Sequence, residues 1–450
     1  MKPADLVRAL FADPGVRATA TTRIIMLVGA PVSLYLAATR VHPEMQGYYF
    51  VGVNIVALAQ LFELGLGTII VQFASHEWPR LRWNARGGLE GDPIARDAIN
   101  ALLLTALCWY GWAATALFVL AGVGGIVTFG SAFGDVWWSF VILWGGFTVI
   151  TATYLLMIPF ICVAEGCGDL VSVQRMRALQ AAAILIALWV GIIWAGPLAA
   201  AWLAAAAQLL VAMAWLLVRH RGLLQAPRSL PAHLLDRTQG LTARYHIEQG
   251  RSGQFWLALF LTSQLLAPIL LRERGGNDAG RLGITLAIAM APLTLSIAWL
   301  HGRYPSFGAL VAAGRTIELD SLSRRATGEA VAVFLASAIC LAAGVRLLPY
   351  IAPVMAVRIL PLGYLAALFC GSLASLLIQA MAGWLRAFRD EGFAAPIVAG
   401  ATGVVLVSGI CGAVGGVQFM VVGFALTNVC FAVPVAARHF FRVRRERLAA

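Results

Sequence analysis

The chain alternates long apolar stretches with short polar connections. Each apolar stretch spans 18–26 residues, and a helix needs about 20 apolar residues to cross a bilayer. The predicted crossings are 22–39, 47–72, 98–121, 138–163, 173–194, 199–218, 252–271, 282–300, 327–345, 359–384, 392–413 and 417–437. The pattern therefore predicts an all-α, polytopic membrane protein with about twelve transmembrane helices.

The longest polar connection falls midway, after six crossings. It covers 219–251 and is a natural linker between two halves. We predict an N-terminal lobe over 1–218, a cytoplasmic linker over 219–251 and a C-terminal lobe over 252–450, with a central cavity between two pseudo-symmetric six-helix lobes. Six crossings return the chain to its starting side, so the two repeats would be parallel and related by an axis along the membrane normal.

Weak sequence echoes support a duplication of the two halves. Gln46-Gly47-Tyr48 opens the second stretch and Ala279-Gly280-Arg281 opens the eighth. Arg23 opens the first stretch and Arg251 the seventh, 228 positions later. The two arginines are therefore expected at matching depths in the two lobes.

Basic residues are concentrated on one side of the predicted membrane. Of 33 lysines and arginines, six fall in the alternate connections, and the other 27 lie on the side of the chain termini. The six are Arg40, Arg272, Arg274, Arg281, Arg346 and Arg358. Because cytoplasmic loops carry the excess of basic residues, both termini are predicted to be cytoplasmic.

Composition supports a membrane protein and excludes nucleic acid as the reason for the positive charge. Hydrophobic residues make up 60% of the chain and charged residues 12%, whereas soluble domains carry about 25% charged residues. The net charge of +12 lies in cytoplasmic connections, where it matches an anionic inner leaflet.

No arrangement typical of an enzyme, a cofactor site or a metal site is found in the sequence. The seven histidines are scattered and no known catalytic motif occurs. Most of the seven cysteines lie within apolar stretches without metal-ligand spacing, which favours a packing role. The sequence predicts no enzyme activity, no cofactor and no metal.

The second stretch holds the densest set of polar residues. Asn54, Gln60 and Glu63 lie within it, and Gln60 and Glu63 share a helix face. Polar groups inside a membrane usually face a cavity or a partner. We interpret Asn54 and Gln60 as cavity-lining residues and Glu63 as a candidate coupling residue. A structural Glu63, paired with an arginine, is the alternative.

Arg23 and Arg251 are the main candidates for substrate binding, with Gln254 in the next turn. Two guanidinium groups from two lobes suit a diphosphate, because arginine binds phosphate oxygens in bidentate fashion. Alternatively, each arginine extends to the membrane interface without contacting a substrate. Pro31, Pro268 and Pro292 interrupt predicted helices, and each frees a backbone carbonyl where a helix can bend.

The segment from Glu44 to Glu77, with Gln46-Gly47-Tyr48 and Leu61-Phe-Glu-Leu-Gly-Leu-Gly67, resembles bacterial polysaccharide-biosynthesis membrane proteins. These form the O-antigen flippase (Wzx-type) branch of the multidrug/oligosaccharidyl-lipid/polysaccharide (MOP) exporter superfamily. The resemblance implies flipping of an undecaprenyl-diphosphate-linked oligosaccharide, an O-antigen or exopolysaccharide repeat unit, across the bacterial inner membrane. Membrane lipids and other polysaccharide-assembly proteins are the further partners that it implies.

Two other functions are kept as alternatives. Cation-exporting relatives carry an acidic residue deep in the first or seventh helix, and this chain has none in either. That difference weighs against a multidrug or metabolite antiporter of the MATE type, which is the second hypothesis. A membrane polymerase or ligase of polysaccharide assembly would need a long outer loop with paired basic residues, which the sequence lacks.

Overall fold

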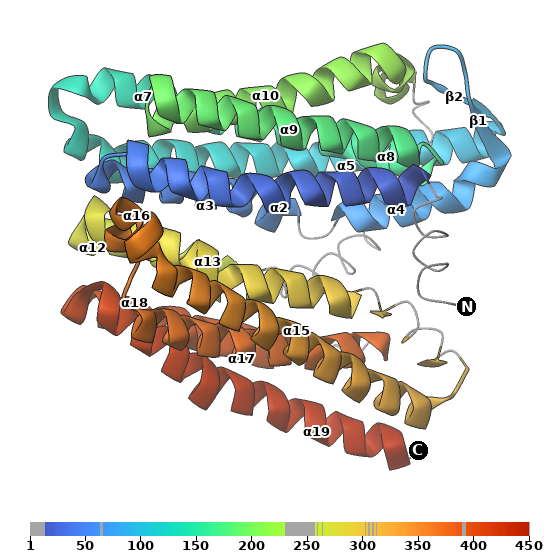
Figure 1. The fold of residues 1–450 in the computed structure, drawn as a ribbon. Coiled ribbons are helices and arrows are strands. Elements are labelled where there is room, and N and C mark those ends of the chain that lie inside the picture. The colour runs from blue at the N-terminus through green and yellow to red at the C-terminus, as the bar shows by residue number, and fades with distance from the viewer. Residues whose placement is uncertain are drawn as a thin grey trace. The chain divides into compact units, whose positions relative to one another are not determined.

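The computed structural model describes residues 14–63, 66–229, 257–258, 260–262, 264–301, 303–304, 307, 310–311, 313–388 and 393–449. These residues are almost all helical (Figure 1). The first half contains α2 (Pro14–Arg40), α3 (Pro43–Glu63), α4 (Leu66–Glu77), α5 (Pro93–Leu117), α6 (Gly124–Phe129), α7 (Trp137–Leu155), α8 (Ile158–Gly166), α9 (Leu170–Trp194) and α10 (Pro197–Arg219). The second half contains α12 (Leu266–Arg274), α13 (Gly276–His301), α15 (Thr316–Ile351), α16 (Pro353–Arg358), α17 (Leu362–Ala387), α18 (Ala394–Thr427) and α19 (Val433–Ala449).

Shorter elements connect these helices. They are the 3-10 helices η1 (Trp78–Arg80), η3 (Gly130–Val136) and η4 (Arg221–Ser229), the π-helices η2 (Phe118–Val123) and η6 (Asn428–Ala432), and a hairpin of β1 (Leu81–Trp83) and β2 (Leu89–Gly91). The strands pair antiparallel, with Arg82 opposite Glu90. The Asn84 side chain accepts hydrogen bonds from the backbone amides of Arg86 and Gly88, at 2.9 and 2.8 Å, which closes the turn.

Apolar helices long enough to cross a membrane dominate the fold. Among the described residues, eight helical segments meet both the length and the hydropathy needed. One of them, Ala394–Leu448, contains a sharp break at Gly416, where φ is +76°. Glycine adopts this left-handed conformation easily, and the break lies between the eleventh and twelfth predicted stretches. The prediction of an all-α, multi-pass membrane protein is confirmed.

The chain forms two compact units. Unit 1 comprises Met1–Val41 and Ile55–Gly253, and unit 2 comprises His42–Asn54 and Gln254–Ala450. The first half of α3 therefore belongs to unit 2, although it precedes most of unit 1 in the sequence. Much of the predicted 219–251 linker lies outside the described residues, so the predicted lobe boundaries stay a prediction.

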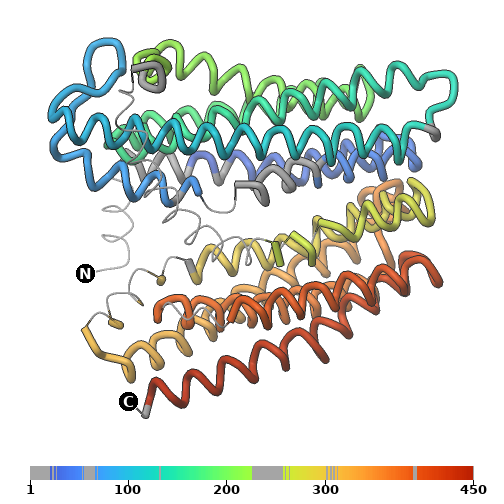
Figure 2. The backbone as a smooth tube through the Cα atoms, turned by 180° about the vertical axis from the view of Figure 1, so that it is seen from behind, coloured from blue at the N-terminus to red at the C-terminus, as the bar shows by residue number. Residues whose placement is uncertain are grey.

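Corresponding helices have the same neighbours in the two units. In unit 1, α9 packs on α2 and α10, α10 packs on α7, and α5 packs on α7. In unit 2, α18 packs on α12 and α19, α19 packs on α17, and α15 packs on α17. In order of crossing, the fifth helix thus contacts the first and sixth, and the fourth contacts the third and sixth, in both units. The paths of these helices can be followed from behind in Figure 2.

Two connections differ from the expectation of simple loops. Residues 121–137 are helical through η2, α6 and η3, and Trp144 Nε1 donates to the Ala121 carbonyl at 2.9 Å. Residues 346–358 complete α15 and form α16. Both connections are rich in glycine or apolar residues, and their helical turns, interrupted at Gly134 and Ala352, satisfy most backbone groups internally, as an apolar environment requires.

Candidate functional site

Most of the site residues predicted from the sequence lie outside what the structure describes. This holds for the side chains of Arg23, Gln60 and Glu63, whose backbone belongs to α2 and α3, and for Arg251 and Gln254 altogether. The diphosphate site and the coupling residue therefore stay predictions.

Asn54 is the predicted site residue whose side chain the structure does describe. Its Nδ2 donates to the backbone carbonyl of Gln264 at 2.9 Å. In a regular helix that carbonyl would accept from the amide four residues later, but residue 268 is proline and has no N–H. The Asn54 amide thus satisfies a carbonyl that Pro268 leaves free. Pro268 predicts a freed carbonyl from the sequence, but its partner Asn54 is seen only in the structure.

A seam of glycines joins the first half of α3 to α13 within unit 2. Gly276, Gly280 and Gly283 follow one face of α13 at the spacing that lets two membrane helices approach closely. A Cβ on Gly280 would lie 2.6 Å from the Gln46 Cβ, and a Cβ on Gly47 would lie 2.7 Å from the Gly276 Cα. Side chains larger than hydrogen would force these helices apart, so the seam explains why His42–Asn54 packs in unit 2.

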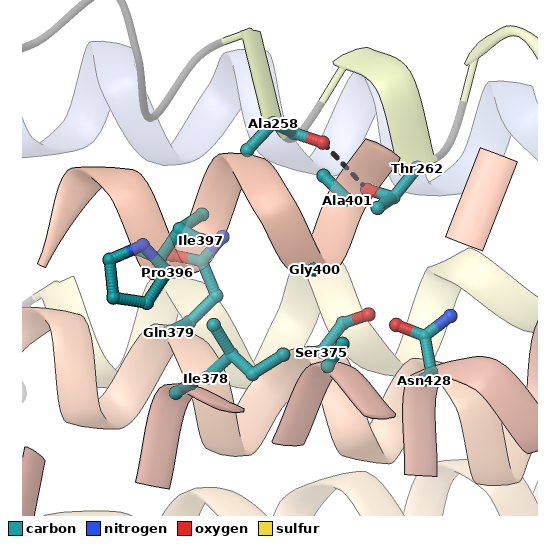
Figure 3. A pocket seen from close by; sticks show the side chains of 12 residues that line it. Ala258, Thr262, Ser375, Ile378, Gln379, Pro396, Ile397, Gly400, Ala401 and Asn428 are labelled. Carbon is teal, nitrogen blue, oxygen red and sulfur yellow. Dashed lines mark hydrogen bonds between the residues drawn. The ribbon is translucent and has the colours of Figure 1, made fainter. Parts of the chain in front are cut away.

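A small cavity lies inside unit 2 (Figure 3). Its described lining residues belong to α17, α18, η6, α19 and the helical turns at 257–262, and none of them is charged. Its accessible volume is about 40 Å³, enough for a few water molecules and far too small for an oligosaccharide. This cavity is therefore not a substrate path.

The polar groups of the cavity are mostly bonded within their own helices. Thr262 donates to the Ala258 carbonyl at 3.0 Å (dashed in Figure 3), Ser375 to Gly371 at 3.1 Å and Asn428 to Phe424 at 2.9 Å. Gln379 differs, because its buried Oε1 has no hydrogen-bond partner within the described protein. A bound water is the ligand that fits this acceptor and this volume.

A second polar cluster closes the end of unit 1 at which α10 ends. Asp169 accepts from Arg219 Nε and from His220 Nε2, both at 2.9 Å. The His220 ring packs against the Trp83 and Trp215 rings, with centroid distances of 4.5 and 4.8 Å. Burial lowers the pKa of His220 below its usual 6.5, although the hydrogen bond and charge of Asp169 oppose that shift. The imidazole is therefore neutral at physiological pH.

The hairpin completes this cluster. Trp83 Nε1 donates to the Cys167 carbonyl at 2.9 Å, and the Gly222 amide donates to the Arg86 carbonyl at 2.9 Å. Burial raises the pKa of the Cys167 thiol to about 12, so this thiol is not a reactive thiolate. Within the described ranges, no group of histidine, cysteine and acidic side chains could hold a metal ion.

Comparison with known proteins places the fold. An inward-facing multidrug resistance MATE family transporter of the MOP superfamily superposes with a TM-score of 0.63 at 13% identity, over 93% of this chain and 96% of that chain. A variant of a Vibrio cholerae MATE transporter gives a TM-score of 0.62 at 13% identity, over 98% of both chains. The chain has the fold of the MATE transporters.

The same fold is shared with a lipid flippase. The lipid II flippase MurJ, in an inward closed conformation, matches with a TM-score of 0.57 at 10% identity, over 95% of this chain and 91% of that chain. No family model and no curated protein matches the sequence. The similarity therefore shows that this chain shares its fold with MATE transporters and with MurJ.

Proposed function

We propose that this protein is a transporter that flips a lipid-diphosphate-linked oligosaccharide from the inner to the outer leaflet. The cargo would be an O-antigen or exopolysaccharide repeat unit on undecaprenyl diphosphate, as in the Wzx-type branch that the sequence resembles. The protein would lie in the bacterial inner membrane with both termini in the cytoplasm. Support comes from the MOP-type fold, shared with a lipid flippase, and from the arginines in the first helix and just before the predicted seventh helix.

The charge of the first helix carries the proposal. α2 contains Arg17, Arg23 and Arg40 and no aspartate or glutamate. The predicted seventh helix, 252–271, also lacks an acidic residue and is preceded by Arg251. A cationic substrate needs a carboxylate at membrane depth, whereas a diphosphate needs guanidinium groups. We assign Arg23 and Arg251 to the diphosphate, with Asn54, Gln60 and Gln254 toward the sugars.

Membrane potential could drive the outward step. Because the inside of the membrane is negative, moving one negative charge outward is favourable and releases about 2.3 kcal/mol per 100 mV. A diphosphate would then cross without a coupled ion. Glu63 is the residue that we assign to coupling if a proton is used.

The glycine seam is the part of unit 2 that we expect to open and close. Alternating access in this fold class requires helices to separate on one side of the membrane and meet on the other. A seam of small residues separates without leaving interlocked side chains. A disulfide between Gln46→Cys and Gly280→Cys in a cysteine-free background would hold the seam closed. The two helices would first have to move apart by about 1 Å to fit the disulfide. We expect oxidation to stop transport, and reduction to restore the level that the Gly280→Cys variant with its widened seam keeps before oxidation.

A MATE-like multidrug or metabolite antiporter is the second candidate, and the TM-score of 0.63 to a MATE transporter favours it. The two functions differ in the charge of the substrate. The antiporter would move an organic cation against a proton or sodium gradient, whereas the flippase moves an anionic lipid.

The test is flipping by the purified full-length protein in liposomes. A fluorescent undecaprenyl-diphosphate oligosaccharide is placed in the membrane, and its arrival in the other leaflet is read with an impermeant quencher. Arg23→Ala with Arg251→Ala should reduce flipping to the rate of empty liposomes, and the two Lys variants should restore only part of it, because lysine lacks the bidentate fork. Arg82→Ala, at an exposed position of β1, is the matched control. Full flipping by the double Ala variant, or transport of a cationic dye instead, would contradict the proposal.

A further inference from the structure

Five arginines gather at one end of unit 2, which we call the far end: the end where α12 finishes and α13 and α17 begin. They are Arg272, Arg274, Arg281, Arg346 and Arg358. The junction of α12 with α13 and the short helix α16 lie at this end in Figure 1. These five residues lie on the predicted sparsely charged side of the membrane, and the sequence alone indicates no role for them.

Arg274 has a structural role at this end. Its Nη2 donates to the carbonyls of Ala413 and Val414, both at 2.6 Å. These carbonyls precede the break at Gly416, where the helix can no longer supply amide donors. The Arg274 guanidinium thus caps the helical segment before Gly416.

Arg281 and Arg358 have no comparable structural role among the described contacts. Arg281 Nε and Arg358 Nη1 are each buried, and neither has a hydrogen-bond partner within the described protein. Neither arginine forms an ion pair with a described carboxylate, including Asp278 one turn before Arg281. Buried N–H donors are normally hydrogen-bonded, so each of these half-buried arginines offers one buried donor to an acceptor outside the described protein.

One hydroxyl links the segments that carry the two arginines. The Leu360 amide donates to Thr285 Oγ1 at 3.0 Å, and Thr285 Oγ1 donates to the Arg281 carbonyl at 2.7 Å. Leu360 and its neighbour Ile359 are buried. Arg358 therefore lies two residues before the Leu360–Thr285 hydrogen bond, and Arg281 lies one turn of α13 before Thr285.

We propose that Arg281 and Arg358 form a binding site for the phosphate group of a lipid headgroup at the far end of unit 2. A phosphate has several acceptor oxygens, and arginine donors match them in geometry and charge. A lipid is the source that a membrane offers at the end of a transmembrane bundle. If the proposed function holds, on which this part of the inference rests, the site would receive the diphosphate of the cargo after the outward step. A phospholipid headgroup presents the same chemistry.

The test measures binding of two lipids to the purified full-length protein in detergent. The probes are undecaprenyl diphosphate and phosphatidylglycerol, with phosphatidylcholine as the zwitterionic reference, and native mass spectrometry reads the bound fraction. Arg281→Gln and Arg358→Gln should each weaken binding of at least one anionic probe by about tenfold, the usual effect of losing a hydrogen bond to a charged group. Arg346→Gln, at an exposed position of the same end, should leave binding unchanged.

The outcomes separate the site from the proposed function. Weaker binding of undecaprenyl diphosphate supports the site as a receiver of the cargo. Weaker binding of phosphatidylglycerol alone supports the site and rejects the cargo as its ligand, while flipping through Arg23 and Arg251 is judged separately. Unchanged binding of both probes overturns the proposal. Arg281→Lys and Arg358→Lys guard against misfolding, because they keep the charge and should bind with intermediate affinity.

Discussion

The two units fasten their sixth helix in different ways. In unit 1, Asp169, just before the fifth helix α9, holds Arg219 and His220 at the end of α10. In unit 2, Asp320 of the third helix α15 holds Arg444 of α19 through two hydrogen bonds of 2.6 and 2.8 Å. Unit 1 adds a hairpin and two tryptophans to its cluster, whereas unit 2 adds a second arginine, Arg324, at 2.9 Å.

This difference separates what a duplication preserves from what it does not. Neighbouring helices correspond in the two units because apolar stretches of similar length and order bury one another in the same way. The polar contacts do not correspond. The far end of unit 2 carries five arginines, and the matching predicted connections of unit 1 carry Arg40 alone. Symmetry is thus a good guide to helix packing here and a weaker guide to polar sites, including the predicted Arg23 and Arg251 pair.

The largest effect is expected from breaking the Asp320 clamp. The Asp320 and Arg444 side chains are only 12% and 18% exposed, and removing one partner of a buried pair destabilises by roughly 3–5 kcal/mol. We expect Asp320→Asn to lower the free energy of unfolding by about 3 kcal/mol, near the lower end of this range, because the site is partly open to solvent. The midpoint of thermal unfolding of the full-length protein in detergent measures it.

Glu318→Gln is the control for the clamp. Glu318 pairs with Arg315, and both side chains are more than half exposed, so the loss should be under about 1 kcal/mol. Equal midpoints for the two variants would show that the Asp320 clamp does not hold α19.

The second prediction compares one glycine from each unit. Gly87 and Gly314 have φ of +68° and +69°, so alanine meets the same backbone strain at both. A Cβ on Gly87 would overlap the Arg219 carbonyl, whereas a Cβ on Gly314 would meet no atom of the described residues within 4 Å. We expect Gly314→Ala to destabilise by about 1 kcal/mol and Gly87→Ala by clearly more, because the hairpin could no longer dock on α10.

Limited proteolysis gives a second readout for this pair. Cleavage in the hairpin should accelerate in Gly87→Ala and stay at the wild-type rate in Gly314→Ala. Unchanged cleavage in Gly87→Ala would mean that the hairpin tolerates the side chain and that its docking contributes little.

The third prediction isolates the carbonyl that Pro268 frees in unit 2. Asn54→Ala should leave the Gln264 carbonyl without its donor and destabilise by about 1–2 kcal/mol. In a Pro268→Ala background the regained amide can bond that carbonyl, so the same Asn54 substitution should have less effect. A double-mutant cycle of unfolding midpoints measures the coupling. Additive effects would show that Asn54 and Pro268 act independently.

Hydropathy alone predicted the membrane fold, because a bilayer accepts few structures other than long apolar helices. The hairpin was missed because its strands are three residues each, too short for an alternating pattern to be recognised. The seam could have been found from Gly276, Gly280 and Gly283. The donor to the Gln264 carbonyl could not have been found from the sequence, because Asn54 lies 210 positions from Gln264. Charge counting found Arg281 and Arg358 but could not show that their guanidinium groups lack partners.

The last prediction concerns the effect of pH on the His220 cluster of unit 1. Among the described residues of unit 2, the Asp320 clamp that fastens the sixth helix contains no histidine. The folded-state pKa of His220 lies below 6.5, chiefly because the ring is buried. As pH falls below 6.5, the unfolded chain binds a proton that the folded chain still rejects, so the unfolded state is favoured. The stability from a neutral His220 is complete above pH 6.5 and is lost as pH falls through the lowered pKa.

Unfolding midpoints at pH 7.5 and 5.5 measure this effect, which should be the smallest of the four because it comes from one group. His220→Gln keeps a donor for Asp169 and cannot titrate, so its midpoint should fall less on acidification than that of the wild type. Carboxylates that titrate in the same range affect both proteins alike and cancel in the difference. A variant that loses as much stability as the wild type would assign the acid sensitivity to other groups. The ring would then stabilise unit 1 through its packing between Trp83 and Trp215 and its hydrogen bond to Asp169, without a measurable contribution from its titration.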